Sequence, residues 1–141
     1  MRTGTSGPAA RAAGLTVIGT AGSAEGAALV RAQGSHHVLN HREPNYLDRL
    51  NALTAGGPNV IIEMLANQNL EADLSVVAKH GRIVVVGNRG RIEIDPRKTM
   101  AKDVSILGMA IWNINDNDLI WDYTGASPLT TLRQTLQTAY S

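Results

Sequence analysis

Short runs rich in β-branched residues alternate with helical segments along most of the chain, and glycine bounds many of them. This alternation is typical of βαβ units, in which helices connect parallel strands. The sharpest run is RIVVVG, residues 82–87. Because its apolar residues do not alternate with polar ones, a strand formed there must be covered on both faces. The sequence therefore predicts an α/β fold with a doubly wound parallel sheet.

The remaining elements are expected from the length and spacing of the apolar residues. Further strands are expected at 15–20, 36–40, 59–65, 91–96 and 103–112, of which 59–65 reads as a buried strand. Helices are expected at 23–34, 46–54 and 70–80, with a helical turn at 98–102. In the first helix we expect Ser23 to cap the free N–H groups, Leu29 and Val30 to face inward, and Gly34 to end the helix.

Length and composition narrow the class of protein. A chain of 141 residues suits a single domain with its own core, and 43% hydrophobic with 18% charged residues argues against bulk disorder. A net charge of +1 supplies no basic excess that would predict binding to nucleic acid or to a membrane. No apolar stretch approaches the roughly 20 residues that a membrane helix needs.

The absence of cysteine bears on chemistry and on location. It excludes disulfides, thiolate zinc sites and thiol nucleophiles, and it fits a reducing compartment, so a cytoplasmic protein is expected. The alternative is a mitochondrial presequence, because residues 1–14 carry arginine and no acidic residue.

In open parallel sheets, ligands bind beyond the carboxyl ends of the strands. One such end is GTAGS, residues 19–23, where a glycine-bearing turn leads into a serine-capped helix and presents free N–H groups to an anion. This turn offers no acid to hold the ribose 2′-hydroxyl of NAD, so a bound dinucleotide would be NADP. Arg42 or Arg89 would add positive charge for the extra phosphate, although arginine in a surface loop is more often simply solvated.

Several ordered motifs carry a resemblance to a known family. The segments GTAGSAEG, HREPNYLDRL, IIEMLANQNL, GRIVVVGNRGRIEIDPRKTMAKD and SILG are similar to the cofactor domain of the zeta-crystallin family of quinone oxidoreductases, within the medium-chain dehydrogenase/reductase superfamily. The similarity runs from about Ala10 to about Ile111. It implies NADPH bound in a Rossmann domain and transfer of hydride, or of single electrons, to a quinone without zinc. It also implies a cytosolic homotetramer, and AU-rich RNA as a partner.

The resemblance also implies a set of cofactor-binding residues. Gly22 and His41 match the adenosine phosphate end of the family site, and Asn69 matches a loop residue beside the cofactor. The segment 86–89 matches the turn under the nicotinamide, and 109–111 matches the strand end whose backbone reaches the carboxamide. The candidate residues are Gly22, His41, Asn69, Val86, Gly87, Asn88, Arg89, Met109, Ala110 and Ile111, with Asn88 in place of the usual serine. No catalytic residue and no metal ligand is assigned.

The two ends of the chain depart from the family pattern. Residues 1–14 read as a remnant of the glycine-rich loop and its helix, because GTSG echoes the beginning and ARAAG the end. Pro8 and the short spacing predict neither the first strand nor a multi-turn helix there. We expect a partial NADP-binding Rossmann-like domain at 15–112 and a divergent tail at 113–141, as in a truncated or alternatively spliced form. Impaired activity is expected, with a noncatalytic nucleotide- or RNA-binding module or an inactive isoform as the alternative.

Other residue constellations favour simpler roles. His36, His37 and His41 lack a suitably spaced further metal ligand, and successive strand residues point to opposite faces. Ser23, His41 and Asp48 have the residue types of a hydrolytic triad, but no Gly-x-Ser-x-Gly turn presents a serine. Glu63, inside an apolar strand, is expected to be structural, either in an ion pair or as a carboxylate at the sheet margin.

Overall fold

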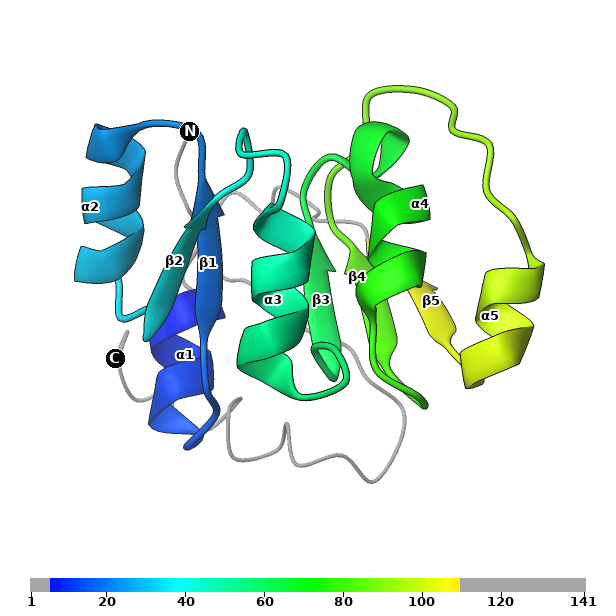
Figure 1. Cartoon of the computed structure of the whole chain (residues 1–141), viewed down its shortest axis with the longest axis horizontal. Coiled ribbons are helices and arrows are strands. Elements are labelled where there is room, and N and C mark those ends of the chain that lie inside the picture. The colour runs from blue at the N-terminus through cyan, green and yellow to red at the C-terminus, as the bar shows by residue number, and fades with distance from the viewer. Residues whose placement is uncertain (1–5, 110–141) are drawn as a thin grey trace, which may run out of the picture. The chain divides into compact units, whose positions relative to one another are not determined.

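The computed structural model describes residues 6–109, which fall into two compact units with a boundary between Arg42 and Glu43 (Figure 1). The first unit is described over 6–42 and the second over 43–109. Both contain parallel strands joined by helices, so the expected parallel α/β architecture is confirmed. None of the helices within 6–109 is long and apolar enough to cross a membrane.

The first unit is a βαβ unit preceded by a helix. Its elements are α1 (Ser6–Ala12), β1 (Ile18–Ala21), α2 (Ala24–Ala32) and β2 (His37–Asn40). The two strands pair in parallel, with Ile18 opposite His37, and α2 packs against both of them. Ala21, Val30 and Leu39 are the buried apolar residues of this unit.

Helix α2 shows why this stretch folds as expected and where it does not. The Ser23 side chain accepts a hydrogen bond from the Gly26 N–H at 3.1 Å, and Gly34 adopts a positive φ of 95° just beyond the helix, so both end signals are confirmed. Val30 is buried, but Leu29 is 47% exposed, so the expectation that both face inward is wrong. Adjacent helical residues point about 100° apart, and a two-stranded sheet covers only a narrow strip of the helix.

Helix α1 corrects another expectation. Seven residues, Ser6–Ala12, form about two helical turns, although the sequence predicted no multi-turn helix here. Pro8 is the third residue of the helix. It lies in the first turn, where a backbone N–H has no intrahelical partner, so the missing donor of proline costs no hydrogen bond.

The second unit carries a three-stranded parallel sheet. Its elements are α3 (Tyr46–Thr54), β3 (Val60–Glu63), α4 (Ala66–Val76), β4 (Arg82–Val85), α5 (Arg97–Lys102) and β5 (Ser105–Gly108). The strand order is β3-β4-β5, and Ile61, Ile83 and Ile106 are paired across it. The expected helix at 46–54 and helical turn near 98–102 are confirmed. Helix α4 begins and ends four residues earlier than the expected 70–80.

The core of this unit lies between α4 and one face of the sheet. Its buried residues are Ala66, Leu70, Leu74, Val77 and Ile83. On β3, Ile61 packs against this core, whereas Val60 and Ile62 are 50% and 39% exposed. The expectation of a buried strand is therefore right for the residues facing α4 and wrong for those facing away.

The expected strand at 91–96 is absent from the sheet. Ile92 and Ile94 pack against the core from an irregular connection, and the Asp95 N–H donates to Glu71 Oε2 at 3.0 Å instead of to a strand. Because β3 and β5 occupy both edges of β4, the segment has no place beside that central strand.

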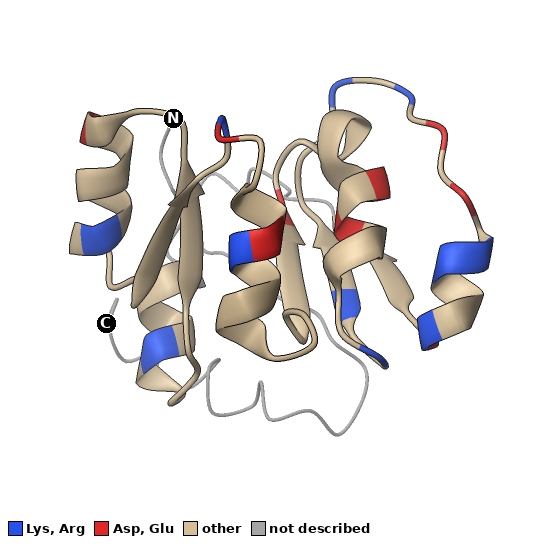
Figure 2. Cartoon of the chain, viewed as in Figure 1, with Lys and Arg blue, Asp and Glu red and all other residues tan. Residues whose placement is uncertain are grey.

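Helix α5 ties the last strand to the core helix. Lys102 Nζ donates to the carbonyl oxygens of Ser75 and Val77 at 2.8 and 2.9 Å, at the end of α4. Lys98 Nζ bonds Glu71 and the Ser75 hydroxyl on the same helix. Figure 2 shows basic residues on α5, after a connection that carries both basic and acidic residues. Cations at a helix C-terminus also complement its dipole, so α5 is well placed to hold β5 in register.

We expect Leu74→Ala to destabilise the chain by about 3 kcal/mol, because it removes a fully buried side chain and leaves a cavity. Urea unfolding followed by circular dichroism measures this loss. Leu53→Ala on α3 is the matched control, since Leu53 is 42% exposed. It should cost less than about 1 kcal/mol, and equal losses for the two variants would contradict the assigned core.

Candidate functional site

The carboxyl ends of β3 and β4 are joined by backbone hydrogen bonds. The carbonyl oxygen of Glu63 accepts from the N–H groups of Val86 and Gly87 at 2.9 and 3.1 Å. The Gly87 carbonyl in turn accepts from the Ala66 N–H at 3.0 Å, at the first residue of α4. The turn after β4 and the start of α4 are therefore held together as one rigid edge.

Gly87 is required in this turn by close approach. A Cβ atom at this position would lie 2.1 Å from the Met64 carbonyl oxygen. Neither atom can rotate away, because the oxygen belongs to the backbone and the Cβ is bonded directly to the backbone. Such a contact is relieved only if β3 and β4 move apart. The glycine therefore lets the strand ends approach, as at other sites where the backbone comes close to a neighbour.

Side-chain amides fix the rest of the turn. Asn67, in the first turn of α4, accepts from the Arg89 N–H through Oδ1 at 3.0 Å. The side chain of Asn88 donates to the Gly90 carbonyl at 2.8 Å, so this amide is engaged within the turn. Sequence reasoning did not single out Asn67, although its position just after a strand end is the signal that would have found it.

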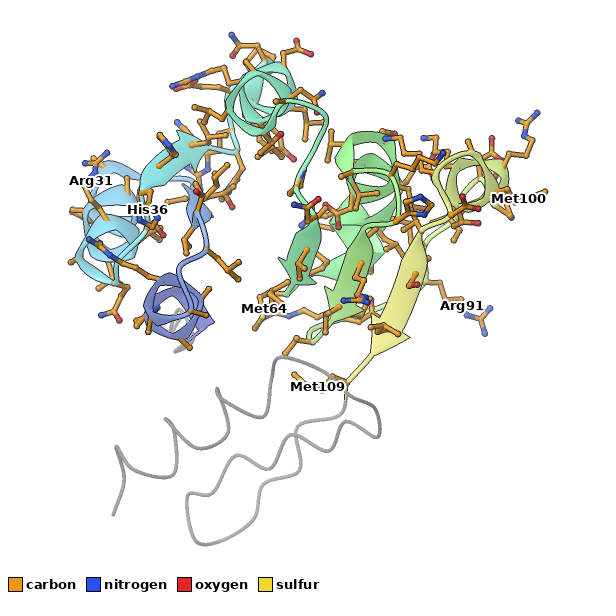
Figure 3. The ribbon with its side chains drawn as sticks, turned by 90° about the horizontal axis from the view of Figure 1, so that it is seen from below. Arg31, His36, Met64, Arg91, Met100 and Met109 are labelled. Carbon is orange, nitrogen blue, oxygen red and sulfur yellow. The ribbon has the colours of Figure 1, made fainter. Side chains whose placement is uncertain are left out.

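The third strand brings the last described candidate to the same edge. The Met109 N–H donates to the Val85 carbonyl at 3.0 Å, directly after β5. Figure 3 shows Met64 and Met109 just beyond the ends of β3 and β5. The structure thus brings together at one end of the sheet Asn69, Val86, Gly87, Asn88, Arg89 and Met109. Ala110 and Ile111 lie outside the described residues.

The first unit places its two candidates side by side. The His41 N–H donates to the Ala21 carbonyl at 3.3 Å, and the Arg42 N–H donates to Asn40 Oδ1 at 3.0 Å. A Cβ atom on Gly22 would lie 2.8 Å from both His41 Nε2 and Arg42 Nε. An imidazole and a guanidinium therefore lie directly beside the glycine that precedes the capped start of α2.

Two acidic side chains meet beneath the edge formed by β3 and α4. Glu63 is 7% exposed, and its Oε1 accepts from the Leu65 N–H and from Asn69 Nδ2, the latter at 3.1 Å. Asp73 lies nearby on α4, and its Oδ2 is buried without a hydrogen-bond partner. Of the two expected roles for Glu63, the carboxylate at the sheet margin is confirmed, and no ion pair with Glu63 is found among residues 6–109. Asp73 was not predicted.

The surroundings of Asp73 raise its proton affinity. Burial, and then the charge and hydrogen bonding of Glu63, raise the pKa of Asp73 to about 8. The pKa of Tyr46, on α3, is also raised by burial and by the charges of Asp73 and Glu63. Asp73 therefore retains its proton near neutral pH beside the Glu63 carboxylate.

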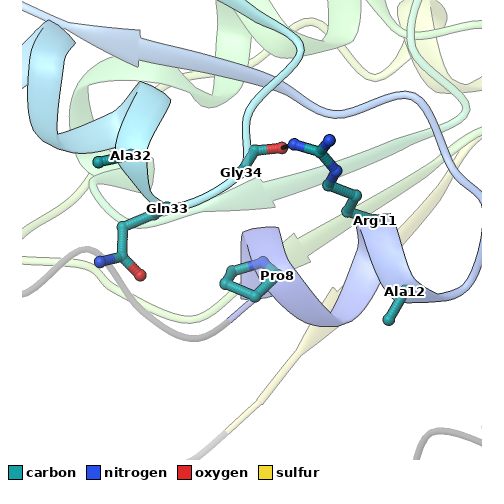
Figure 4. A pocket seen from close by; sticks show the side chains of 6 residues that line it. All are labelled: Pro8, Arg11, Ala12, Ala32, Gln33 and Gly34. Carbon is teal, nitrogen blue, oxygen red and sulfur yellow. Dashed lines mark hydrogen bonds between the residues drawn. The ribbon is translucent and has the colours of Figure 1, made fainter.

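The other constellations have structural partners. His36 Nδ1 accepts from the Val17 N–H at 3.0 Å, and Ser23 caps α2. In the portion of the chain that the structure describes, no group of three or more His, Cys, Asp or Glu is arranged to hold a metal ion. A shallow hollow beside α1 is lined by Pro8, Arg11, Ala12, Ala32, Gln33 and Gly34 (Figure 4). It contains none of the predicted site residues.

Parallel strands joined by helices, with the candidate site residues at the carboxyl ends of the strands, form the arrangement of a nucleotide-binding α/β domain. Residues 6–125 match the zinc-binding dehydrogenase family, and the chain belongs to that family. It is 55% identical to the quinone oxidoreductase of Rattus norvegicus over 106 residues, and 51% identical to that of Homo sapiens over 105. Each alignment covers 74% of this chain and 32% of the relative, so the chain spans about a third of the length of these curated relatives.

A solved structure shares the fold. The quinone oxidoreductase from Thermus thermophilus, whose structure was also determined in complex with NADPH, matches with a TM-score of 0.64 and 26% identity. The match covers 79% of this chain and 34% of the Thermus chain.

We expect Gly87→Ala to destabilise the second unit by more than about 2 kcal/mol, because the new Cβ collides with backbone at Met64. Gly90→Ala is the matched control in the same turn region, since its Cβ would meet nothing closer than Asn67 at 3.9 Å. Thermal unfolding of both variants checks this difference. A Gly90→Ala loss as large as that of Gly87→Ala would show that the close approach is not the cause.

We expect the stability of the chain to fall as the pH rises from about 4 to about 8, through the contribution of Asp73. The folded chain then keeps a proton that the unfolded carboxyl, with a pKa of about 3.9, has lost, at a cost of at most about 1.4 kcal/mol per pH unit. Asp73→Asn should flatten this slope, whereas the exposed control Asp48→Asn should keep it. Urea midpoints between pH 5 and pH 9 measure the slopes, and equal slopes in all three proteins would contradict the assignment.

Proposed function

We propose that this chain binds NADP(H) and serves an NADPH-dependent quinone oxidoreductase. The observation that carries the proposal is the meeting of Asn69, the 86–89 turn and Met109 at one carboxyl edge, in a chain 55% identical to a quinone oxidoreductase. The NADPH complex of the Thermus relative supports the choice of cofactor. We further propose that residues 15–112 form the cofactor-binding region and that 113–141 diverge from it.

The candidate residues fall into two groups, one for each half of the cofactor. We propose that Asn69, the 86–89 turn and 109–111 contact the nicotinamide half, with Ala110 and Ile111 included on the family resemblance alone. Gly22 and His41 would contact the adenosine phosphate half. The fit at this second group is good, because a glycine without a side chain leaves backbone accessible and Arg42 supplies a positive charge beside it.

The preference for NADP over NAD rests on charge. An acid that would bind the ribose 2′-hydroxyl is absent from residues 20–23, and the Arg42 guanidinium lies beside Gly22. Arg89, the other candidate in the sequence, belongs to the 86–89 turn, which we propose for the nicotinamide half. We therefore assign the phosphate contact to Arg42.

In the proposed reaction the bound nicotinamide supplies the hydride, and the protein supplies orientation. The chain's own contribution is the rigid edge: the Gly87 turn is fixed by backbone bonds, and Asn69 is fixed by Glu63. Holding donor and acceptor in line lowers a barrier by about 7–11 kcal/mol in well-oriented systems. No side chain of this chain is proposed as a nucleophile.

The wider context is also a proposal. A quinone acceptor, a cytoplasmic location and a homotetramer follow from the family resemblance, as does AU-rich RNA. A net charge of +1 gives RNA binding no independent support. The second candidate function is a nucleotide-binding module without turnover, which would use the same cofactor-contacting residues.

We expect the chain to bind NADPH more tightly than NADH in isothermal titration calorimetry, and the preference to weaken with added salt. Arg42→Gln should reduce the preference about tenfold, which corresponds to about 1.4 kcal/mol. Arg31→Gln is the matched control, because Arg31 is exposed in the last turn of α2, away from Gly22. Equal affinity for NADH and NADPH would contradict the cofactor assignment.

Turnover separates the two candidate functions. NADPH oxidation is followed by absorbance with a small ortho-quinone and corrected for the uncatalysed rate. Saturable turnover supports the oxidoreductase. Tight NADPH binding without turnover supports the module, and the impaired activity expected from the sequence.

A further inference from the structure

We propose that Glu63 and Asp73 form a positioning pair that shares one proton and holds the Asn69 side chain with its amide oxygen free for a ligand. The effect on cofactor binding rests on the function proposed above. The effect on Asn69 itself does not, because it follows from contacts within the second unit. Neither Glu63 nor Asp73 is assigned to the cofactor.

The amide nitrogen of Asn69 is already used in a hydrogen bond to Glu63. Asn69 Nδ2 donates to Glu63 Oε1 at 3.1 Å, and the same oxygen accepts from the Leu65 N–H. Because the –NH2 end of the amide faces Glu63, the carbonyl end, Oδ1, is left as the acceptor that Asn69 offers elsewhere. Glu63 thus sets which face of Asn69 a ligand meets.

Asp73 needs a proton in this environment. An unpartnered buried carboxylate oxygen carries the full cost of lost solvation, and Asp73 Oδ2 is such an oxygen. A proton on Asp73 makes it a donor, and the neighbouring Glu63 carboxylate, whose charge raises the pKa of Asp73, is the acceptor that we assign to it. The orphaned oxygen then has a partner, and the pair carries one negative charge instead of two.

The proton on Asp73 affects Asn69 through Glu63. Asn69 and Asp73 are four residues apart on α4 and so lie on the same face of the helix, both next to Glu63. Loss of that proton leaves two neighbouring carboxylates charged, and their repulsion pushes Glu63 away from α4. The groups that act on each other here are Glu63 of β3, Asp73 of α4 and Tyr46 of α3. The orientation of Asn69 therefore depends on pH.

The first experiment reads Asn69 without any cofactor. The side-chain amide signals of Asn69 are followed by ¹⁵N NMR between pH 6 and pH 9.5 in the full chain, in Asp73→Asn and in the charge-matched control Asp48→Asn. We expect the signals to titrate in the full chain and in Asp48→Asn. They should stay constant in Asp73→Asn, whose amide donates to Glu63 at every pH. The same titration in all three proteins, or none in any, would overturn the proposal.

The second experiment reads the cofactor. NADPH affinity is measured by fluorescence titration between pH 6.5 and pH 9. As the pH rises over this range, we expect the affinity for NADPH to fall about tenfold more in the full chain than in Asp73→Asn. This corresponds to a difference in binding free energy of about 1.4 kcal/mol. Titration of the NADPH phosphate affects both proteins equally and cancels in this comparison. Parallel pH profiles would overturn the positioning role.

The two experiments distinguish a failure of the proposed function from a failure of the positioning role. If no variant binds NADPH at any pH, the proposed function is wrong, and the NMR titration alone decides whether the pair positions Asn69. If Asp73→Asn does not fold, Glu63→Gln replaces it, because a neutral amide in place of the Glu63 carboxylate removes the repulsion that follows when Asp73 loses its proton. In that variant the Asn69 signals should again lose their titration, and a retained titration would contradict the proposal.

Discussion

The carbonyl oxygen of Glu63 is the point on which the second unit depends. It accepts both N–H groups of the turn after β4, and that turn returns a hydrogen bond to the first residue of α4. These bonds join two strands and a helix within a few ångströms, and they exist only because Gly87 lets the backbones approach. The predicted ligand-binding edge is therefore built from main chain, which a rigid parallel sheet holds more firmly than side chains alone.

Local signals allowed most elements to be predicted, and tertiary competition explains the errors. Ser23 and Gly34 mark the ends of α2 through short-range bonds and backbone freedom, so the sequence is sufficient there. The alternating apolar and polar residues of 91–96 fit an extended strand, but β4 already has a neighbouring strand on each side. Leu29 has the right residue type for a core and the wrong helical angle for a two-stranded sheet. Neither fact is visible in a local pattern.

The candidate site also has a part that the sequence predicted and a part that it did not. Its residues were predicted from motifs, and the structure gathers the described ones into a group in each unit. What the sequence did not reveal is the support beneath them. Asp73 reads as an ordinary polar residue of an amphipathic helix, and only the packing of α4 on β3 brings its carboxyl to Glu63. Asn67 likewise gains its role from the turn after β4, which is distant in sequence.

Glu63 therefore does two separable things at one position. Its backbone holds the turn after β4, and its carboxylate holds the start of α4 through Leu65 and Asn69. Loss of the proton from Asp73 leaves the backbone bonds of Glu63 in place, because they need only the peptide group. The edge of the sheet is thus fixed regardless of pH, whereas Asn69, one turn into the helix, is held by a bond whose strength depends on a proton. This separation lets a rigid fold carry a pH-sensitive contact without losing its sheet.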